Sequence, residues 1–401
     1  MKKVRIIDIA EIKNGSTPST KVRDNYDGNI IWITPKDLSK QNHRFIFRGE
    51  KTITQKGYNS CSTTLIPKGS ILLSSRAPIG LLAIADVECC TNQGFKNLIL
   101  NKEKIDNKWF YYYLKLRINE IEALGSGTTF KELSKTNLEN FEIDIPDLQT
   151  QSAIARVLSS FDDKIELNNT MNKELENLAR TIYEYWFVQN ADEKWERKKI
   201  GEIAETGSGG TPLTSNKEYY ENGNIPWINS NELNFGYILD TKNFITQKGL
   251  NNSSAKLFPA NSILIALYGA TAGKVSLLTF QATTNQAICA IMPTSHAHKY
   301  YLKFYLSNLY KYFNRVSSGS ARDNLSQELI RNLEITLPDT AILEKFNKTV
   351  SPIFEQIIKN SQENAELSQL RDFLLPLLMN GQVKISNNNK NINNKHTDDT
   401  D

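Results

Sequence analysis

The sequence lacks the features that mark several classes of protein. Its four cysteines in 401 residues show neither a disulfide framework nor the CxxC pairs of a zinc site. No run of about 18 apolar residues could span a bilayer, and the first residues contain no apolar stretch of the kind found in a secretory signal. We therefore expect a cytoplasmic protein with reduced thiols and no bound metal.

The chain also lacks a strong excess of charge of one sign. Lysine and arginine number 48 against 44 acidic residues, which gives a formal net charge of +4. This balance permits an acidic partner without requiring one, because nucleic-acid binding depends on where basic side chains cluster. At 401 residues the chain is too long for one ordinary core and predicts two or three domains.

What the sequence does contain is a long internal repeat. The pentamer ITQKG occurs at 53–57 and at 245–249, and TNQ occurs at 91–93 and at 284–286. Three longer segments also recur: GNIIWI as GNIPWI, PKGSIL as PANSIL, and NFEIDIPD as NLEITLPD. The matches keep their order at offsets of 192 to 195 residues, far longer than a solenoid unit. The chain is therefore a tandem duplication of a domain-sized unit.

Each copy has the pattern of a mixed α/β domain. Short apolar runs separated by Gly, Pro and Asn predict strands and turns. A helical period follows at 107–124 in the first copy and at 298–313 in the second. The aromatic residues 111–113 could stack on single-stranded bases, but their helical spacing favours packing in the core.

A long amphipathic helix is predicted after each domain. The first apolar seam comprises Ile154, Leu158, Phe161, Ile165, Met171, Leu175, Leu178, Ile182 and Tyr185. The second comprises Ile342, Phe346, Ile353, Ile357, Leu367, Leu370, Leu374 and Leu377. Pro352 predicts that the second helix kinks or starts late.

Asparagine interrupts both seams, at Asn168 and at Asn360, 192 residues apart. Antiparallel pairing of the two helices would bring these side chains close together, and a buried polar pair is a known means of fixing register. The alternative is that both are exposed polar breaks in helices packed against something else. We expect the coiled-coil pairing to involve Leu158, Ile165, Asn168, Leu175, Ile357, Asn360 and Leu367.

The predicted fold class is α/β (α+β), with two tandem pseudo-symmetric recognition domains separated by two long helices that form an antiparallel coiled coil. The first domain covers 1–147 and its helix 148–190; the second domain covers 191–339 and its helix 340–385. The polar residues 386–401 cannot bury a core and are expected to be disordered. Such pseudo-symmetry suits a reader of two separated half-sites on duplex DNA.

The repeated order of these motifs resembles the specificity subunits of type I restriction-modification systems. The resemblance covers residues 1 to about 385 and includes "IPDLQTQSAIARVLSSFDDKIE" after the first domain. It implies two target recognition domains that bind a bipartite, asymmetric duplex DNA target. It also implies a spacer of two antiparallel helices on which two modification subunits dock.

The cofactors implied by the resemblance belong to partner subunits. Modification subunits would bind S-adenosylmethionine and methylate adenine N6, while restriction subunits would use ATP and Mg²⁺. We expect this chain to bind none of them and to catalyse nothing on its own.

The sequence agrees with a non-catalytic role. No Pro-Pro-aromatic loop is present to clamp a flipped adenine. At 268–276, Tyr268 and Val275 replace the glycine and hydroxyl residue that a phosphate-binding loop requires. Asp147, Asp162 and Lys164 only superficially resemble a nuclease site, since the last two lie on the predicted helix.

The candidate DNA-binding residues are polar or aromatic side chains predicted in loops or at strand ends. They are Lys36, Arg44, Arg48, Arg76 and Lys131 in the first domain, and Asn231, Tyr268, Lys274 and Arg322 in the second. The repeated TNQ segments and the Gly-x-Thr-Pro loops are interpreted as structural turns, because half-sites that differ should not be read by identical residues.

Three alternatives remain open. The chain could serve a methylation-only or a type IIB-like system, it could be an enzyme with its own recognition domain, or it could be a scaffold that binds no DNA. Steep weakening of duplex binding with rising salt would separate a DNA reader from the scaffold, because phosphate contacts release counterions.

Overall fold

The computed structural model describes residues 1–41, 43–127, 131–234, 236–317 and 325–385. The chain divides into two compact units, of which the first is built from two segments distant in sequence and the second from one continuous segment. Unit 1 comprises residues 1–167 and 364–401, and unit 2 comprises residues 168–363. Within the described residues, no helix combines the length and the apolar character needed to cross a bilayer.

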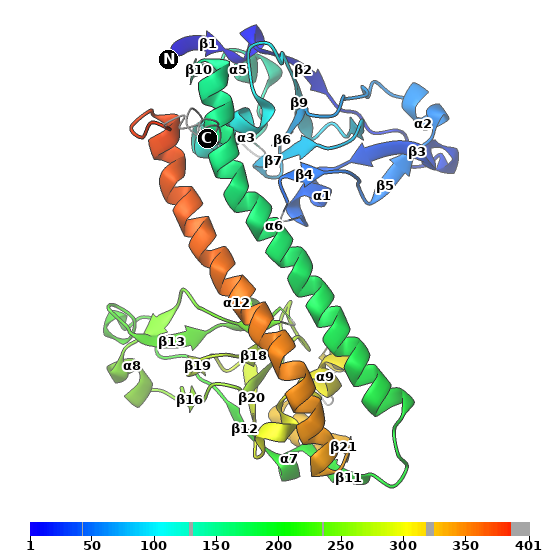
Figure 1. Cartoon of the computed structure of the whole chain (residues 1–401), viewed down its shortest axis with the longest axis vertical. Helices are drawn as coiled ribbons and strands as arrows, with labels where there is room; N and C mark the ends of the chain where they lie inside the picture. The colour runs from blue at the N-terminus through cyan, green and yellow to red at the C-terminus, as the bar shows by residue number, and fades with distance from the viewer. Residues whose placement is uncertain (42, 128–130, 235, 318–324, 386–401) are drawn as a thin grey trace, which may run out of the picture. The chain divides into compact units, whose positions relative to one another are not determined.

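Unit 1 begins with a domain of short strands and helices (Figure 1). Its strands are β1 Lys2–Arg5, β2 Ala10–Asn14, β3 Tyr26–Ile33, β4 Phe45–Ile46, β5 Lys51–Ile53, β6 Ile71–Ser75, β7 Ile79–Ala85, β8 Cys90–Thr91, β9 Phe95–Leu100 and β10 Glu142–Ile145. Its helices are α1 Pro35–Ser39, α2 Gln55–Asn59, α3 Asn107–Leu116, α4 Ile118–Ala123 and α5 Lys135–Glu139.

The domain of unit 2 has a similar succession of elements, with β16 as an additional strand. Its strands are β11 Glu196–Lys199, β12 Ala204–Ser208, β13 Ile225–Ile228, β14 Tyr237–Ile238, β15 Phe244–Ile245, β16 Leu257–Phe258, β17 Ile263–Ala266, β18 Val275–Leu278, β19 Ala282–Thr284, β20 Ile288–Pro293 and β21 Glu334–Leu337. Its helices are α7 Ile200–Ile203, α8 Gln247–Asn251, α9 Lys299–Asn308, α10 Tyr310–Ser317 and α11 Gln327–Asn332.

The sheets confirm the duplication strand by strand. Unit 1 has a five-stranded sheet ordered β2-β9-β6-β7-β4, and unit 2 has its counterpart ordered β12-β20-β17-β18-β14. A second sheet is ordered β5-β3-β8 in unit 1 and β15-β13-β19-β16 in unit 2. A two-stranded ribbon joins the beginning of each domain to its end, β1 to β10 and β11 to β21.

The repeated ITQKG pentamer is a helix-capping unit. Thr54 accepts a hydrogen bond from the amide of Gly57 and donates one to the carbonyl of Asp24, while the ammonium group of Lys56 binds the carboxylate of Asp24. A Cβ added at Gly57 would lie 2.2 Å from the carbonyl oxygen of Asn25.

The second copy makes the same contacts. Thr246 caps α8 by accepting from the amide of Gly249, and both Thr246 and Lys248 hydrogen-bond to Glu218. A Cβ at Gly249 would lie 2.7 Å from the carbonyl oxygen of Tyr219. The pentamer therefore recurs because the helix start and its close backbone approach need these residue types.

The repeated Gly-x-Thr-Pro and TNQ segments bind each other. In unit 1 the amide of Ser16 donates to the carbonyl of Thr91, and the side chains of Thr17 and Gln93 hydrogen-bond. In unit 2 the amide of Gly210 donates to the carbonyl of Thr284, and Thr211 donates to Gln286 at 2.5 Å. These contacts confirm the interpretation of both segments as structural turns.

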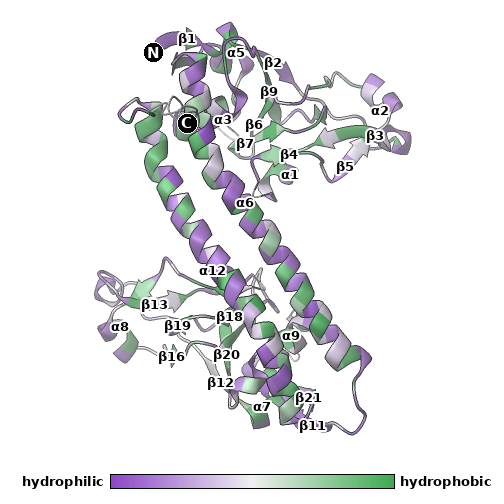
Figure 2. Cartoon of the chain, in the orientation of Figure 1, coloured by the Kyte–Doolittle hydropathy of each residue, from purple (hydrophilic) through white to green (hydrophobic). Residues whose placement is uncertain are grey.

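Two long helices follow the domains, α6 Leu148–Glu184 and α12 Thr340–Met379, and a π-helical turn at 185–189 follows α6. The prediction of a late start at Pro352 is wrong, because α12 already begins at Thr340 and passes through that proline. Hydrophobic and hydrophilic residues alternate along both helices (Figure 2). The predicted polar tail, 386–401, lies outside the described residues.

The two helices pair antiparallel within each unit. In unit 1, Arg371 of α12 forms an ion pair with Asp162 of α6, and Leu158 lies in one apolar cluster with Leu375 and Leu378. In unit 2, residues further along α6 meet earlier residues of α12: Asn168 donates to Glu363 at 2.8 Å, and the rings of Tyr183 and Phe346 lie 6.2 Å apart. The predicted antiparallel pairing is therefore correct.

A layer of polar side chains joins the helices in unit 2. Asn168 and Asn360 are both buried, which excludes the alternative of two exposed breaks. Asn360 donates to Asn172 at 2.8 Å, and Asn172 donates to Ser361 at 3.1 Å. The layer is thus wider than the predicted pair, since each asparagine bonds a different residue of the facing helix.

The predicted seams are wrong at several positions. Met171 and Leu178 of α6, Tyr185 of the following π-helical turn and Leu370 of α12 are exposed, whereas Ala179 and Tyr183 of α6 are buried. The latter pack on the sheet and α9 of unit 2 as well as on α12, so the buried face of α6 turns toward the domain. Leu175 and Leu367 are partly buried.

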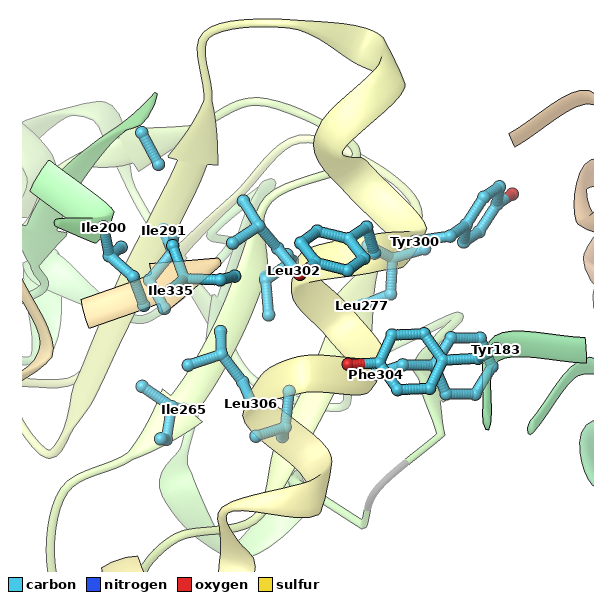
Figure 3. Close-up of a cluster of buried hydrophobic side chains, with 14 of the residues drawn as sticks. Tyr183, Ile200, Ile265, Leu277, Ile291, Tyr300, Leu302, Phe304, Leu306 and Ile335 are labelled. Carbon is cyan, nitrogen blue, oxygen red and sulfur yellow. The ribbon is translucent and has the colours of Figure 1, made fainter. Parts of the chain in front are cut away.

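The core of unit 2 lies between its five-stranded sheet, α9 and the long helices. Leu302 and Leu306 of α9 point toward Ile265 and Ile291 of the sheet, and Tyr183 of α6 stacks beside Phe304 (Figure 3). Ile357 of α12 belongs to this same cluster. In unit 1, all three tyrosines at 111–113 are buried, which confirms core packing rather than base stacking.

Replacing Gly57 or Gly249 with alanine is predicted to destabilise the unit that contains it. The new methyl group would overlap a backbone carbonyl, so we expect a loss of about 2–4 kcal/mol, measured by chemical denaturation. Lys56→Ala is the matched control, because it removes only an exposed ion pair worth about 0–1 kcal/mol. Equal stability of G57A and K56A would contradict this role of the glycine.

Candidate nucleic-acid interface

Two of the predicted DNA-binding residues in unit 1 are exposed beside α1 and β4. The ammonium group of Lys36 lies 3.1 Å from the Glu50 carboxylate, and this hydrogen bond raises the pKa of Lys36. Arg48 lies over the exposed ring of Phe47, with its guanidinium carbon 5.7 Å from the ring centroid. Both side chains are accessible to a ligand.

Arg44 is a correction to the predicted interface. It precedes β4, as expected for a strand end, but it is only 4% exposed. Its guanidinium group binds the carboxylates of Asp163 and Glu166 on α6 and donates to the hydroxyl of Tyr112 at 3.2 Å. These partners leave no free face for a DNA phosphate, so Arg44 joins the domain to α6.

A buried polar cluster thus connects the first domain to both long helices. Asp162 accepts from the Tyr112 hydroxyl at 2.5 Å and forms an ion pair with Arg371. Burial opposes the charge of Arg44, but hydrogen bonds to Glu166 and Asp163 raise the pKa of Arg44 above its ordinary value. Asp162 therefore has a structural role, which agrees with rejecting it as part of a nuclease site. Ile165 lines the cavity beside this cluster.

Arg76 and Lys131 are brought together in one cavity of about 790 Å³. The cavity lies between the β6–β7 turn and the segment that precedes α5, and Glu132 also lines it. The guanidinium group of Arg76 lies 3.9 Å from the Glu132 carboxylate. Glu122 lines the cavity as well, so these two predicted residues share it with two carboxylates.

Lys96 was missed by the sequence analysis. It lies on β9 with its side chain only 8% exposed, and its ammonium group is 3.7 Å from Glu132. Burial lowers the pKa of Lys96, while Glu132 opposes this shift. A lysine within the mainly apolar run FKNLIL was the available signal, because a charged residue is rarely buried in a strand without a partner.

The candidates in unit 2 are more dispersed. Asn231 is exposed on a short 3₁₀ turn, residues 230–232, and Tyr268 is exposed directly after β17. Lys274 is partly buried just before β18. Arg322 lies outside the described residues.

Unit 2 replaces the buried polar cluster with aromatic rings. At an offset of 192 residues, the two copies have equivalent positions in these helices. Phe354 is equivalent to Asp162, Phe304 to Tyr112, and Ala179 to Arg371. Lys303 is buried among them, with its ammonium nitrogen 5.3 Å from the ring centroid of Tyr237 and 5.5 Å from that of Phe354. Burial lowers the pKa of Lys303 to about 8, although the charge of Glu176 opposes the shift.

Comparison with known proteins places the chain in a family. The sequence model of the type I restriction modification DNA specificity domain matches residues 1–177 and again 192–369. The two matches coincide with the duplication found in the sequence and in the sheets.

Similar proteins carry consistent names. The chain is 34% identical over 403 residues to the type I restriction enzyme MjaIX specificity subunit of Methanocaldococcus jannaschii, covering 95% of this chain and 93% of that protein. It is 27% identical to the HindI specificity subunit of Haemophilus influenzae, covering 64% of this chain and 72% of that protein.

A solved structure shares the fold. The crystal structure of a type I restriction-modification S subunit from M. genitalium matches with a TM-score of 0.60 at 20% sequence identity. The match covers 96% of each chain. It therefore supports the duplicated architecture over nearly the whole length.

Replacing Lys303 with methionine is predicted to stabilise the protein and flatten its pH profile. Because the folded pKa is depressed, the unfolded chain binds more protons between about pH 8 and 10.5, and stability rises with pH there. At pH 7 the variant should gain about 1–3 kcal/mol. Chemical denaturation at pH 7 and pH 10 measures the free energy of unfolding of both proteins. The prediction is contradicted if this free energy changes between the two pH values by the same amount in the variant as in the wild type.

Proposed function

Because this chain belongs to the family of type I restriction-modification specificity subunits, we propose that its two domains bind the two halves of one asymmetric duplex DNA target. The supporting observation is that the two domains share the same strand order and internal contacts but carry different side chains on their surfaces. The capping unit, the turn contacts and the strand order recur, while Tyr268 and Cys289 of unit 2 stand at the positions of Arg76 and Lys96 in unit 1. Different surfaces on one scaffold suit half-sites of different sequence.

We also propose that two identical modification subunits dock on the long helices. The observation that supports this is a pair of exposed leucines. Leu178 on α6 is 50% exposed and Leu370 on α12 is 46% exposed, and they stand 192 residues apart at equivalent positions of the duplication. Two identical partners need two equivalent contacts, and exposed apolar side chains are typical of such contacts.

The chemistry is assigned to these partners. Modification subunits would bind S-adenosylmethionine and methylate adenine N6, and restriction subunits with ATP and Mg²⁺ would cut unmodified DNA. This chain would supply target selection and assembly in the cytoplasm.

Methyl transfer to a DNA library, with labelled S-adenosylmethionine, tests this proposal. We expect transfer only when the chain is combined with its modification subunits, and we expect the modified adenines to lie in a bipartite sequence. Methylation by the purified chain alone would show that it is an enzyme in its own right. No duplex binding by the assembled complex would favour the non-DNA scaffold.

Leu178→Glu and Leu370→Glu are each predicted to remove one docking site. A complex with two modification subunits should fall to one in either single variant and lose both in the double variant, as measured by analytical ultracentrifugation. Thermal stability of the isolated chain should change little, since both positions are half exposed. Met171→Glu, which changes an exposed residue of α6 without this equivalence, is the matched control. Full assembly by the double variant would contradict the docking surface.

A further inference from the structure

The two copies differ at the tip of one hairpin. In unit 1 the turn between β6 and β7 spans 76–78, whereas in unit 2 the connection between β17 and β18 spans 267–274. Arg76 follows β6, and Tyr268 stands 192 residues later, after β17. The same place in the scaffold thus carries an arginine in one copy and a tyrosine in the other.

The strands that hold these two turns are equivalent. β6 pairs antiparallel with both β7 and β9, and β17 pairs antiparallel with both β18 and β20. All residues of β6 and β17 are buried. Because the strands agree while the tips differ, packing does not dictate the residue type at either tip.

The tip in unit 1 lines a cavity of about 790 Å³. Arg76 and Lys131 share this cavity with Glu122 and Glu132, and the ammonium group of Lys96 lies 3.7 Å from Glu132. The side chain of Arg76 is 40% exposed, so its guanidinium group can reach a ligand from this turn. The arginine fork matches the two acceptors of a guanine edge in the major groove, O6 and N7.

The site in unit 2 has different chemistry at corresponding positions. Cys289 pairs with Ile265 of β17 as Lys96 pairs with Leu73 of β6, so the strand register places Cys289 where unit 1 has Lys96. The ring of Tyr268 is 49% exposed. An exposed phenol offers apolar contact to a thymine methyl group and one hydrogen bond, without the charge of Arg76.

We propose that Arg76, assisted by Lys131, reads a guanine in the half-site bound by unit 1, and that Tyr268 reads the other half-site from the equivalent turn. This inference rests on the proposed function, because it names the residues by which each domain selects its bases. Arg76 and Tyr268, which stand at equivalent positions of the two copies, would thus select different bases.

Mapping of methylated adenines in cells that express the full chain with its modification subunits tests this assignment. The wild-type complex should give one bipartite sequence. Arg76→Ala should relax a guanine position in one half-site at least 10-fold, and Tyr268→Ala should relax the other half-site only. Arg76→Lys should keep less of the guanine preference than the wild type, because lysine keeps the charge but lacks the rigid planar fork of arginine.

Lys56→Ala is the matched control, since it changes an exposed lysine of the repeated capping unit, and it should leave both half-sites unchanged. Thermal melting of each variant separates relaxed specificity from unfolding. The assignment is overturned if Arg76→Ala lowers methylation equally at all sequences, if Arg76→Lys retains the guanine, or if both tip variants affect the same half-site. A wild-type complex that shows no bipartite sequence would instead refute the proposed function.

Discussion

The antiparallel pairing of α6 with α12 is the constraint on which each unit depends. Unit 1 consists of residues 1–167 together with the C-terminal part of the chain, so its core closes only when α12 supplies Leu375 and Leu378 against Leu158. Unit 2 is continuous in sequence, yet it still needs the pairing, because Phe346 of α12 packs on Tyr183 and Phe187 of α6. The first domain to be synthesised is therefore the last to be completed.

The two units use incompatible chemistry where domain meets helix. Unit 1 buries Arg44 and Tyr112 against Asp162, whereas unit 2 packs Phe304 against Phe354 at the equivalent positions. A helix segment placed on the wrong domain would bury a carboxylate among aromatic rings or leave a guanidinium group unpaired, and either arrangement costs several kcal/mol. Two domains of common origin thus accept only their own helix segments, which discourages misassembly within and between chains.

The sequence predicted the architecture well because a duplication is visible without any knowledge of packing. Matched motifs indicated both domains, and the heptad pattern indicated both long helices, although Pro352 suggested a late start that α12, which begins at Thr340, does not have. It failed where a helix contacts more than one neighbour. A seam extrapolated from 4-3 spacing assumes a single partner, but the C-terminal half of α6 also faces the sheet and α9, so Leu178 turned outward and Ala179 inward.

The site was predicted less well for the same reason. Arg44 and Arg48 look alike in sequence, and only the carboxylates that α6 brings to Arg44 distinguish a buried structural arginine from an exposed one. The position of Lys96 in a strand-like run marked it as unusual, but its ion pair with Glu132 is seen only in the folded chain. Ion pairs between segments far apart in the chain leave no local pattern to detect.

A scaffold that must serve two half-sites separates stability from specificity. Gly57 lies against the backbone of Asn25, and Thr54 accepts a hydrogen bond from the Gly57 amide. Both copies retain these two residue types. Arg76 and Tyr268 project from turns whose strands are already fully buried, so exchanging them disturbs little of the core. Substitution at such a tip is nearly neutral for folding, so the residue at either tip can change while the strands and the long helices stay the same.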